Sequence, residues 1–334
     1  MNILVIGNRD RYEKFSPEAL SNPAYEITFF PRGTAEDALI SRAGGAEIIL
    51  ADAIAAVPGT LIERMPRLRL IHSEGVAYDK IDMRAADEKG ILVCNNRGCN
   101  AAAVAEQTIL LMLAWLRSAV AGDREVRAGN QIAMKERKMV EGITELGSCT
   151  IGLAGFGDIA KATAERLNSF GCRLYYYAPH RRSVDEERAY RVRYAPLYEL
   201  AALSDIVSVH AAVTDTSRGM INAAFIARMK QTAFIVNTAR GEIIDNAALR
   251  DALIAGKIAG AAFDCLYPEP TPGDHPLVDL PASVRDRVVY APHLGGITTE
   301  SFRRAHKNMW ANVDRIAHGK DPVNIVNRDA RPRR

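Results

Sequence analysis

The sequence predicts an α/β protein made of two doubly wound domains, each built on a mostly parallel sheet. Short apolar runs rich in branched residues recur along the chain and are typical of buried strands. Helical stretches lie between them, in the alternation that βαβ units require. The predicted strands are too many for one small sheet, and 334 residues exceed a single typical core, so we expect two domains.

The first predicted strand is Asn2–Gly7, which reads NILVIG and ends at a glycine. Further runs of this kind predict strands at Glu47–Leu50, Leu70–His72, Ile91–Cys94, Ile151–Ala154, Arg173–Tyr177, Ile206–His210, Ala233–Asn237, Ala259–Asp264 and Val288–Tyr290. The clearest helical stretches between them are Ala101–Leu116, Ile159–Phe170 and Asn246–Ala255.

The composition is that of a soluble globular protein, with 48% hydrophobic and 25% charged residues. A net charge of +3, from 43 basic and 40 acidic side chains, argues against a dedicated nucleic-acid binder. The basic segment Arg328–Arg334 is expected to be a solvated tail. There is no signal-peptide pattern, and the longest apolar run, Ile109–Leu116, is too short to cross a bilayer. We therefore expect a cytoplasmic protein without a membrane partner.

Five cysteines are present, an odd number with no CxxC pair: Cys94, Cys99, Cys149, Cys172 and Cys265. They fit neither a disulfide framework nor a zinc site, so no metal is expected. We expect most of them to be buried in a reducing compartment.

A glycine motif follows the strand that ends at Ala154. The chain reads Gly155-x-Gly157-x-x-Ala160 and continues into a helix and then a second strand. Gly155 allows the tight turn, Gly157 lets the backbone approach a pyrophosphate, and the helix N-terminus binds the phosphates. Because strand, loop, helix and strand all fall at βαβ spacing, the motif predicts a dinucleotide site in a Rossmann domain.

The position of this motif, far from the N-terminus, predicts a domain inserted into the middle of the chain. We expect residues 101–293 to form the dinucleotide-binding domain. Residues 1–100 together with 294–334 would form the other domain.

The end of the second strand bears on the choice of cofactor. Ala178 stands there in place of the acidic residue that holds the ribose hydroxyls of NAD, and Arg181 and Arg182 follow. Arginines bind a 2′-phosphate through charge-assisted hydrogen bonds. The sequence therefore favours NADP over NAD, unless the two arginines only begin a solvated helix.

Three downstream loops carry candidate catalytic residues. Arg240, Glu269 and His293 each follow a predicted buried strand. Loops at the carboxyl ends of parallel strands line the ligand crevice, so these side chains are expected to converge there. Of the other histidines, we expect only His210 to lie near the cofactor crevice.

The motifs, in their order, resemble the D-isomer-specific 2-hydroxyacid dehydrogenases. The resemblance extends from about Leu70 to Asn327. It includes EGVAYDKID from Glu74, NAAAVAE from Asn100, the glycine loop and DIVSVH from Asp205. It continues through the loops of Arg240, Glu269 and His293 and ends at GKDPVNIVN. It implies a Rossmann domain inserted into a flavodoxin-like substrate domain, a small 2-oxo or 2-hydroxy acid as substrate, and a homodimer.

The resemblance also implies roles for particular residues. Arg240 would clamp the substrate carboxylate and 2-oxo oxygen. His293 would donate a proton to that oxygen during reduction, and Glu269 would bond the other ring nitrogen and stabilise the protonated ring. Backbone N–H groups of Gly75 and Val76, from the other domain, would hold the carboxylate.

Further residues would contact the cofactor. Asp158 and Ile159 would bind the diphosphate, and Asp264 would accept from the carboxamide. The remaining implied contacts are Thr108, Thr238, Ala239, Arg240, His293 and Gly295, near the nicotinamide.

Two other functions remain open on the sequence alone. A dinucleotide-sensing regulator, such as the corepressors that resemble these dehydrogenases, can keep the same residues. A formate or phosphite dehydrogenase on this scaffold also remains possible. The substrate itself is not predicted, because its side-chain pocket would come mainly from the first 100 residues, where no motif is present.

Overall fold

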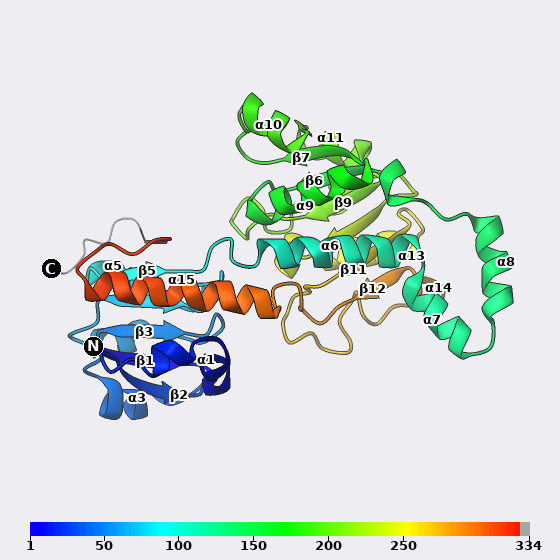
Figure 1. Cartoon of the computed structure of the whole chain (residues 1–334). Helices are drawn as coiled ribbons and strands as arrows, with labels where there is room; N and C mark the ends of the chain where they lie inside the picture. The colour runs from blue at the N-terminus through cyan, green and yellow to red at the C-terminus, as the bar shows by residue number, and fades with distance from the viewer. Residues whose placement is uncertain (328–334) are drawn as a thin grey trace. The chain divides into compact units, whose positions relative to one another are not determined.

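The computed structural model describes residues 1–327, so the predicted tail Arg328–Arg334 lies outside the described residues. The chain divides into two compact units (Figure 1). Unit 1 comprises Met1–Asn100 and the segment from Thr298, and unit 2 comprises Ala101–Ile297. Unit 2 thus extends from Ala101 to Ile297, whereas the sequence prediction placed the dinucleotide-binding domain at residues 101–293. The backbone N–H of Leu294 donates to Asp264 after β11, so the loop after His293 is bonded to unit 2.

Unit 1 contains a five-stranded parallel sheet in the order β2-β1-β3-β4-β5, the flavodoxin-like order. Its strands are β1 (Asn2–Ile6), β2 (Glu26–Phe30), β3 (Ile48–Ala51), β4 (Leu70–Ser73) and β5 (Leu92–Cys94). Its helices are α1 (Arg9–Phe15), α2 (Pro17–Leu20), α3 (Glu36–Ala43), α4 (Gly59–Glu63), α5 (Met83–Glu88) and α15 (Thr299–Ala317).

Unit 2 contains a seven-stranded parallel sheet in the order β12-β11-β10-β9-β6-β7-β8. Its strands are β6 (Thr150–Ala154), β7 (Arg173–Tyr177), β8 (Val192–Tyr194), β9 (Ile206–Val209), β10 (Phe234–Asn237), β11 (Gly260–Phe263) and β12 (Val288–Tyr290). The order reverses between β6 and β9, as in a Rossmann fold, and ligands bind at such a reversal.

The helices of unit 2 cover both faces of this sheet or extend from it. They are α6 (Ala101–Leu116), α7 (Ala119–Arg127), α8 (Gln131–Glu141), α9 (Asp158–Phe170), α10 (Val184–Tyr190), α11 (Leu197–Leu203), α12 (Ala223–Ile226), α13 (Asn246–Ile254) and α14 (Ala282–Arg285). Short 3₁₀ turns lie at Leu146–Ser148 and Gly241–Ile243.

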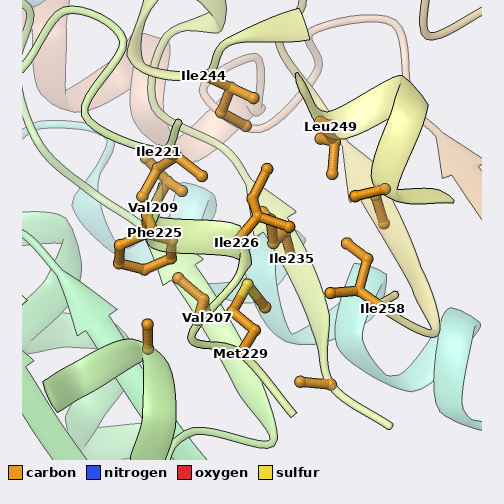
Figure 2. Packing of buried hydrophobic residues seen from close by; sticks show 14 of the residues in the cluster. Val207, Val209, Ile221, Phe225, Ile226, Met229, Ile235, Ile244, Leu249 and Ile258 are labelled. Atoms are coloured by element: carbon orange, nitrogen blue, oxygen red, sulfur yellow. The ribbon is translucent and has the colours of Figure 1, made fainter. Parts of the chain in front are cut away.

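The core of unit 2 lies on the two faces of its sheet. Because side chains alternate along a strand, Val207 and Ile235 pack on one face, while Ile206 and Phe234 pack on the other. Figure 2 shows the first of these clusters, in which Phe225 from α12 packs near the strand residues. All five cysteines are buried and free, as predicted.

The two strands that the apolar pattern does not predict are both at a sheet edge. β2 ends the unit 1 sheet and is only partly buried, and β8 is a three-residue strand with an exposed arginine in the middle. The other two edge strands, β5 and β12, were predicted from their apolar runs, whereas β2 begins with an exposed glutamate and β8 is interrupted by an exposed arginine, so neither shows a fully apolar run.

Helix α6 is a core helix of unit 2. Leu111 and Met112 are buried, and Trp115 stacks on Phe234 with ring centroids 4.0 Å apart. Ile109 and Leu116 are buried as well, whereas Leu110 is 56% exposed. Within residues 1–327 no single helix is long and apolar enough to cross a membrane; α6 and α7 reach that length and hydropathy only as a pair, bent by 56°.

Candidate active site

The glycine loop after β6 has the backbone geometry that its sequence predicts. Gly155 has φ 105°, and a Cβ there would lie 2.5 Å from the backbone nitrogen of Ala211, so only glycine fits. A Cβ on Gly157 would meet no atom within 4 Å. The open side of Gly157 is therefore available to a ligand that must approach the backbone closely.

The first turn of α9 begins directly after Gly157, at Asp158 and Ile159. First-turn N–H groups have no carbonyl partner within their own helix, and the helix dipole favours an anion there. The loop has no room for a side chain at Gly155 and has open space next to Gly157. This space, in front of the helix N-terminus, fits the diphosphate of a dinucleotide.

His210 lies beside this loop, since its carbonyl carbon is one of the atoms that bar a Cβ at Gly155. Its Nε2 lies 2.8 Å from Ser208 Oγ, and its Nδ1 is buried without a partner among the described residues. Burial lowers the pKa of His210 to about 3, so the ring is neutral. His210 directly follows β9, next to the point where the strand order reverses.

The two arginines after β7 have different partners. Arg181 makes a two-pronged ion pair with Glu187, at 2.8 and 2.9 Å. Arg182 donates from Nη2 to the carbonyl of Phe156, within the glycine loop, at 3.1 Å. Ala178 is buried at the end of the strand. Arg182 therefore lies at the dinucleotide loop, while Arg181 is already neutralised.

Thr108 and Thr238 meet beneath the loop that follows β10. Their hydroxyl oxygens are 2.8 Å apart, and both side chains are buried. Ala239, the next residue, donates its N–H to Asn237 Oδ1 at 3.0 Å. The pair of threonines thus joins α6 to the loop that carries Arg240.

Arg240 is half-buried and keeps most of its guanidinium unpaired. Its Nη1 donates to the carbonyl of Ala239 at 2.8 Å, and within residues 1–327 its other guanidinium nitrogens have no hydrogen-bond or ion-pair partner. Asn237, fully buried, donates to the carbonyl of Arg240 at 3.1 Å and so fixes the loop. A rigidly held, unpaired guanidinium is suited to bind a planar anion.

His293 and Glu269 form the expected pair. The Nδ1 of His293 lies 2.9 Å from both carboxylate oxygens of Glu269. An ionised carboxylate only accepts hydrogen bonds, so Nδ1 carries a proton, and Nε2 is the nitrogen that can exchange one. The side chains are 37% and 55% exposed, so the pair contributes little to folding stability.

The backbone at His293 is strained, with φ 57° in the left-handed region. Asp264, buried at the end of β11, accepts the N–H groups of Leu294 and Gly295, each at 2.9 Å. Gln107 approaches the same carboxylate at 3.5 Å. These bonds hold the loop in the conformation that presents His293.

Three charged residues of the site act on one buried thiol. Burial raises the pKa of Cys265 to about 12; the negative charges of Asp264 and Glu269 raise it further, and the positive charge of Arg240 lowers it. The loops after β10 and β11 are therefore close to one another, as parallel neighbouring strands require.

Gly75 and Val76 follow β4 in unit 1. The N–H of Gly75 makes a long bond of 3.3 Å to Ser73 Oγ, and the N–H of Val76 has no partner among the described residues. Both carbonyls are bound by the protein, to the backbone N–H of Asn96 and the side chain of Asn95. The protein therefore binds both carbonyls, while the N–H of Val76 is left for a ligand and the N–H of Gly75 is held only by its long bond to Ser73.

Sequence reasoning missed the residues that support these loops. Asn237 ends a predicted strand, and a polar residue at the end of a buried strand could have indicated a loop anchor. Glu187 is one of three acidic residues in the first turn of α10, and the sequence does not indicate which of them pairs with Arg181. No sequence motif indicated that Gln107 approaches Asp264; only its neighbour Thr108 had been predicted to contact the cofactor.

Replacing Gly157 by Ala should weaken dinucleotide binding and leave the fold intact. The new methyl group meets no protein atom, but it occupies the space next to the loop. Titration of the variant with NADPH and NADH should give a Kd raised by about tenfold or more, with an unchanged urea unfolding midpoint. Gly273→Ala, also at an open and exposed glycine, is the control. Normal affinity in the Gly157 variant would show that the diphosphate lies elsewhere.

Comparisons with known proteins agree with this geometry. Residues 109–295 match the family model described as D-isomer specific 2-hydroxyacid dehydrogenase, NAD binding domain. The chain is 36% identical to a glyoxylate reductase of Korarchaeum cryptofilum, over 88% of this chain and 83% of that protein. It is 33% identical to a hydroxypyruvate reductase of Thermotoga maritima, over 88% of this chain and 92% of that protein.

A solved structure shows the same architecture. The apo form of D-mandelate dehydrogenase from Rhodotorula graminis is 25% identical, with a TM-score of 0.85, and the match covers 99% of each chain. The family match, the relatives and the shared two-unit fold give one conclusion: this chain belongs to the D-isomer-specific 2-hydroxyacid dehydrogenase family.

Proposed function

We propose that this chain reduces a small 2-oxo acid to the D-2-hydroxy acid with NADPH or NADH. The observation that carries the proposal is the His293–Glu269 pair, held on the same sheet edge as the unpaired guanidinium of Arg240. The pair supplies a proton, and the guanidinium binds the anionic substrate. The relatives named as glyoxylate and hydroxypyruvate reductases support this substrate class.

Arg240 would bind the substrate through its free N–H groups. Its fork matches a carboxylate, and its charge stabilises the negative charge that develops on the 2-oxo oxygen. The N–H groups of Gly75 and Val76 would hold the same carboxylate from unit 1. Unit 1 would thus be the substrate domain and unit 2 the dinucleotide domain.

His293 would deliver a proton from Nε2 to the 2-oxo oxygen. Glu269, bonded to Nδ1, fixes the tautomer and stabilises the protonated ring, so the ring can give the proton and later regain it. The reduced nicotinamide, when bound, supplies the hydride.

The cofactor would be held along the sheet edge of unit 2. Gly155, Gly157, Asp158 and Ile159 would hold the diphosphate. Near the nicotinamide we place Thr108, Thr238, Ala239, Arg240, Asp264, His293 and Gly295. Asp264 Oδ1 accepts from Leu294 and Gln107, whereas Oδ2 accepts only the N–H of Gly295 and has capacity for a second donor, which fits a carboxamide.

Measurement of turnover distinguishes this proposal from the two alternative functions, a dinucleotide-sensing regulator and a formate or phosphite dehydrogenase. Purified enzyme with NADPH or NADH should reduce glyoxylate or hydroxypyruvate at steady state. His293→Ala should lower kcat by roughly 10²–10⁴-fold, and Glu269→Gln by less, with cofactor affinity unchanged. His318→Ala, an exposed histidine paired with Asp314, is the control. Binding of the dinucleotide without turnover would favour a regulator, and oxidation of formate or phosphite alone would identify the other rival.

We also propose that the enzyme prefers NADPH. Ala178 provides no carboxylate to repel a 2′-phosphate, and Arg182 is bonded to the glycine loop. Arg181 is neutralised by Glu187, so Arg182 is the stronger phosphate ligand of the two. A charge-assisted hydrogen bond of about 1.5–3 kcal/mol gives about tenfold preference or more.

Single replacements should separate the two arginines. Arg182→Ala should remove most of the NADPH preference in kcat/KM and leave NADH activity nearly unchanged, whereas Arg181→Ala should have the smaller effect. Arg188→Ala, on the same segment and 78% exposed, is the control. Equal kcat/KM for the two cofactors in the wild-type enzyme would contradict the assignment.

We propose that the chain forms a homodimer through the arm formed by α7 and α8. Figure 1 shows this arm lying away from the sheet of unit 2. It exposes Val120, Val126, Ile132, Met139 and Val140, whereas most of the apolar side chains of α6 are buried. A row of exposed apolar side chains on a projecting segment is typical of an interface.

Sedimentation velocity should give twice the 36.5 kDa chain mass. Replacing Met139 by Lys and Val140 by Glu should shift the enzyme to the monomer, because charges would be buried in the contact. A monomeric wild-type enzyme at micromolar concentration would contradict the proposal.

A further inference from the structure

A cluster of charged side chains lies at the carboxyl edge of the unit 1 sheet. Arg11 is in the first helix after β1, Arg32 follows β2, Asp52 follows β3 and Glu74 follows β4. Parallel pairing brings these positions to one edge. Neither carboxylate is accessible, since Asp52 is 8% and Glu74 is 4% exposed.

Arg11 connects the two carboxylates. Its Nη2 donates to Asp52 Oδ2 and to Glu74 Oε2, the latter at 2.6 Å. Burial alone would lower the pKa of Arg11, but Glu74 and Asp52 raise it above its ordinary value, so the guanidinium is charged. On its other side, Glu74 Oε1 lies 3.0 Å from Nε2 of the buried His306, whose Nδ1 lies 2.7 Å from Ser16 Oγ.

Glu74 directly precedes the Gly75–Val76 loop, and its backbone is fixed. Asn96 donates from Nδ2 to the carbonyl of Glu74 at 2.9 Å and from its backbone N–H to the carbonyl of Gly75 at 2.8 Å. The carboxylate of Glu74 is held in turn by Arg11 and His306, so its position one residue before the loop is fixed. A buried negative charge next to N–H groups that bind a carboxylate opposes that binding unless it is neutralised.

We propose that Arg11 is a positioning residue that neutralises Glu74 and so sets the affinity of the Gly75–Val76 loop for the substrate carboxylate. The inference rests on the proposed function, which places that carboxylate at these N–H groups. Arg11 acts through Glu74 and takes no part in proton or hydride transfer.

The two partners of the ion pair should therefore change KM in opposite directions. Arg11→Met leaves the cluster of Asp52, Glu74 and Arg32 with one negative charge in excess and should raise KM for the 2-oxo acid by roughly tenfold, because that charge repels the substrate carboxylate. Glu74→Gln leaves Arg11 paired with Asp52, but Arg32 is also within 3.8 Å of Asp52, so the cluster keeps one positive charge in excess and KM should fall. The double variant should return KM to near the wild-type value, and kcat should change by less than about threefold in each.

A purely structural ion pair would not give this pattern, because either single replacement would disturb the loop and raise KM. Two KM shifts in the same direction would overturn the inference, as would a double variant as impaired as Arg11→Met. If Arg11→Met does not fold, the KM of Glu74→Gln is sufficient to test the proposal. An unchanged or raised KM in that variant would contradict it.

The exposed Arg9–Glu13 pair on the same helix is the matched control, and Arg9→Met and Glu13→Gln should leave KM unchanged. Wild-type turnover is measured first with glyoxylate and hydroxypyruvate. No turnover overturns the proposed function and this inference with it, whereas normal turnover without opposite KM shifts overturns this inference alone.

Discussion

Parallel pairing of buried strands is the constraint on which the site of unit 2 depends. β6 pairs with β7 on one side and with β9 on the other, and β10, β11 and β12 continue the sheet in the same direction. Every strand therefore ends at the same edge, where residues distant in sequence meet. A register slip of one residue would exchange the faces of Ile235 and Phe234, both of which are buried, so the arrangement of the loops is fixed by the core beneath them.

The site combines accessible reactive groups with buried polar anchors. His293 and Glu269 are reachable from solvent, while Asn237 and Asp264, which hold the neighbouring loops, are almost completely buried. A buried side chain with satisfied hydrogen bonds has one favourable arrangement, so it transmits the rigidity of the sheet to the loop. The unfavourable backbone conformation of His293 persists because Asp264 determines the positions of the two residues after it.

The sequence was sufficient for the features that have a local signature. The central strands, the glycine loop and the order of the loops follow from apolar runs and backbone geometry, and they were predicted. Strands β2 and β8 were not, because an exposed charged residue at the start of β2 and in the middle of β8 breaks the apolar run. The different roles of Arg181 and Arg182 were also not predictable, since they depend on whether Glu187 or Phe156 is nearby.

The return of the chain after unit 2 has a consequence for synthesis on the ribosome. Helix α15 supplies Met309, Val313 and Ile316 to a core that also contains Ile3, Val5 and Leu50. Asn327 accepts from the N–H of Val93 at the edge strand of the same unit. The first unit to begin emerging is thus the last to acquire its complete core, while the sequence of unit 2 is contiguous. Between the translation of β5 and of α15, the apolar side chains that α15 later covers stay exposed, and exposed apolar surface of this kind promotes aggregation.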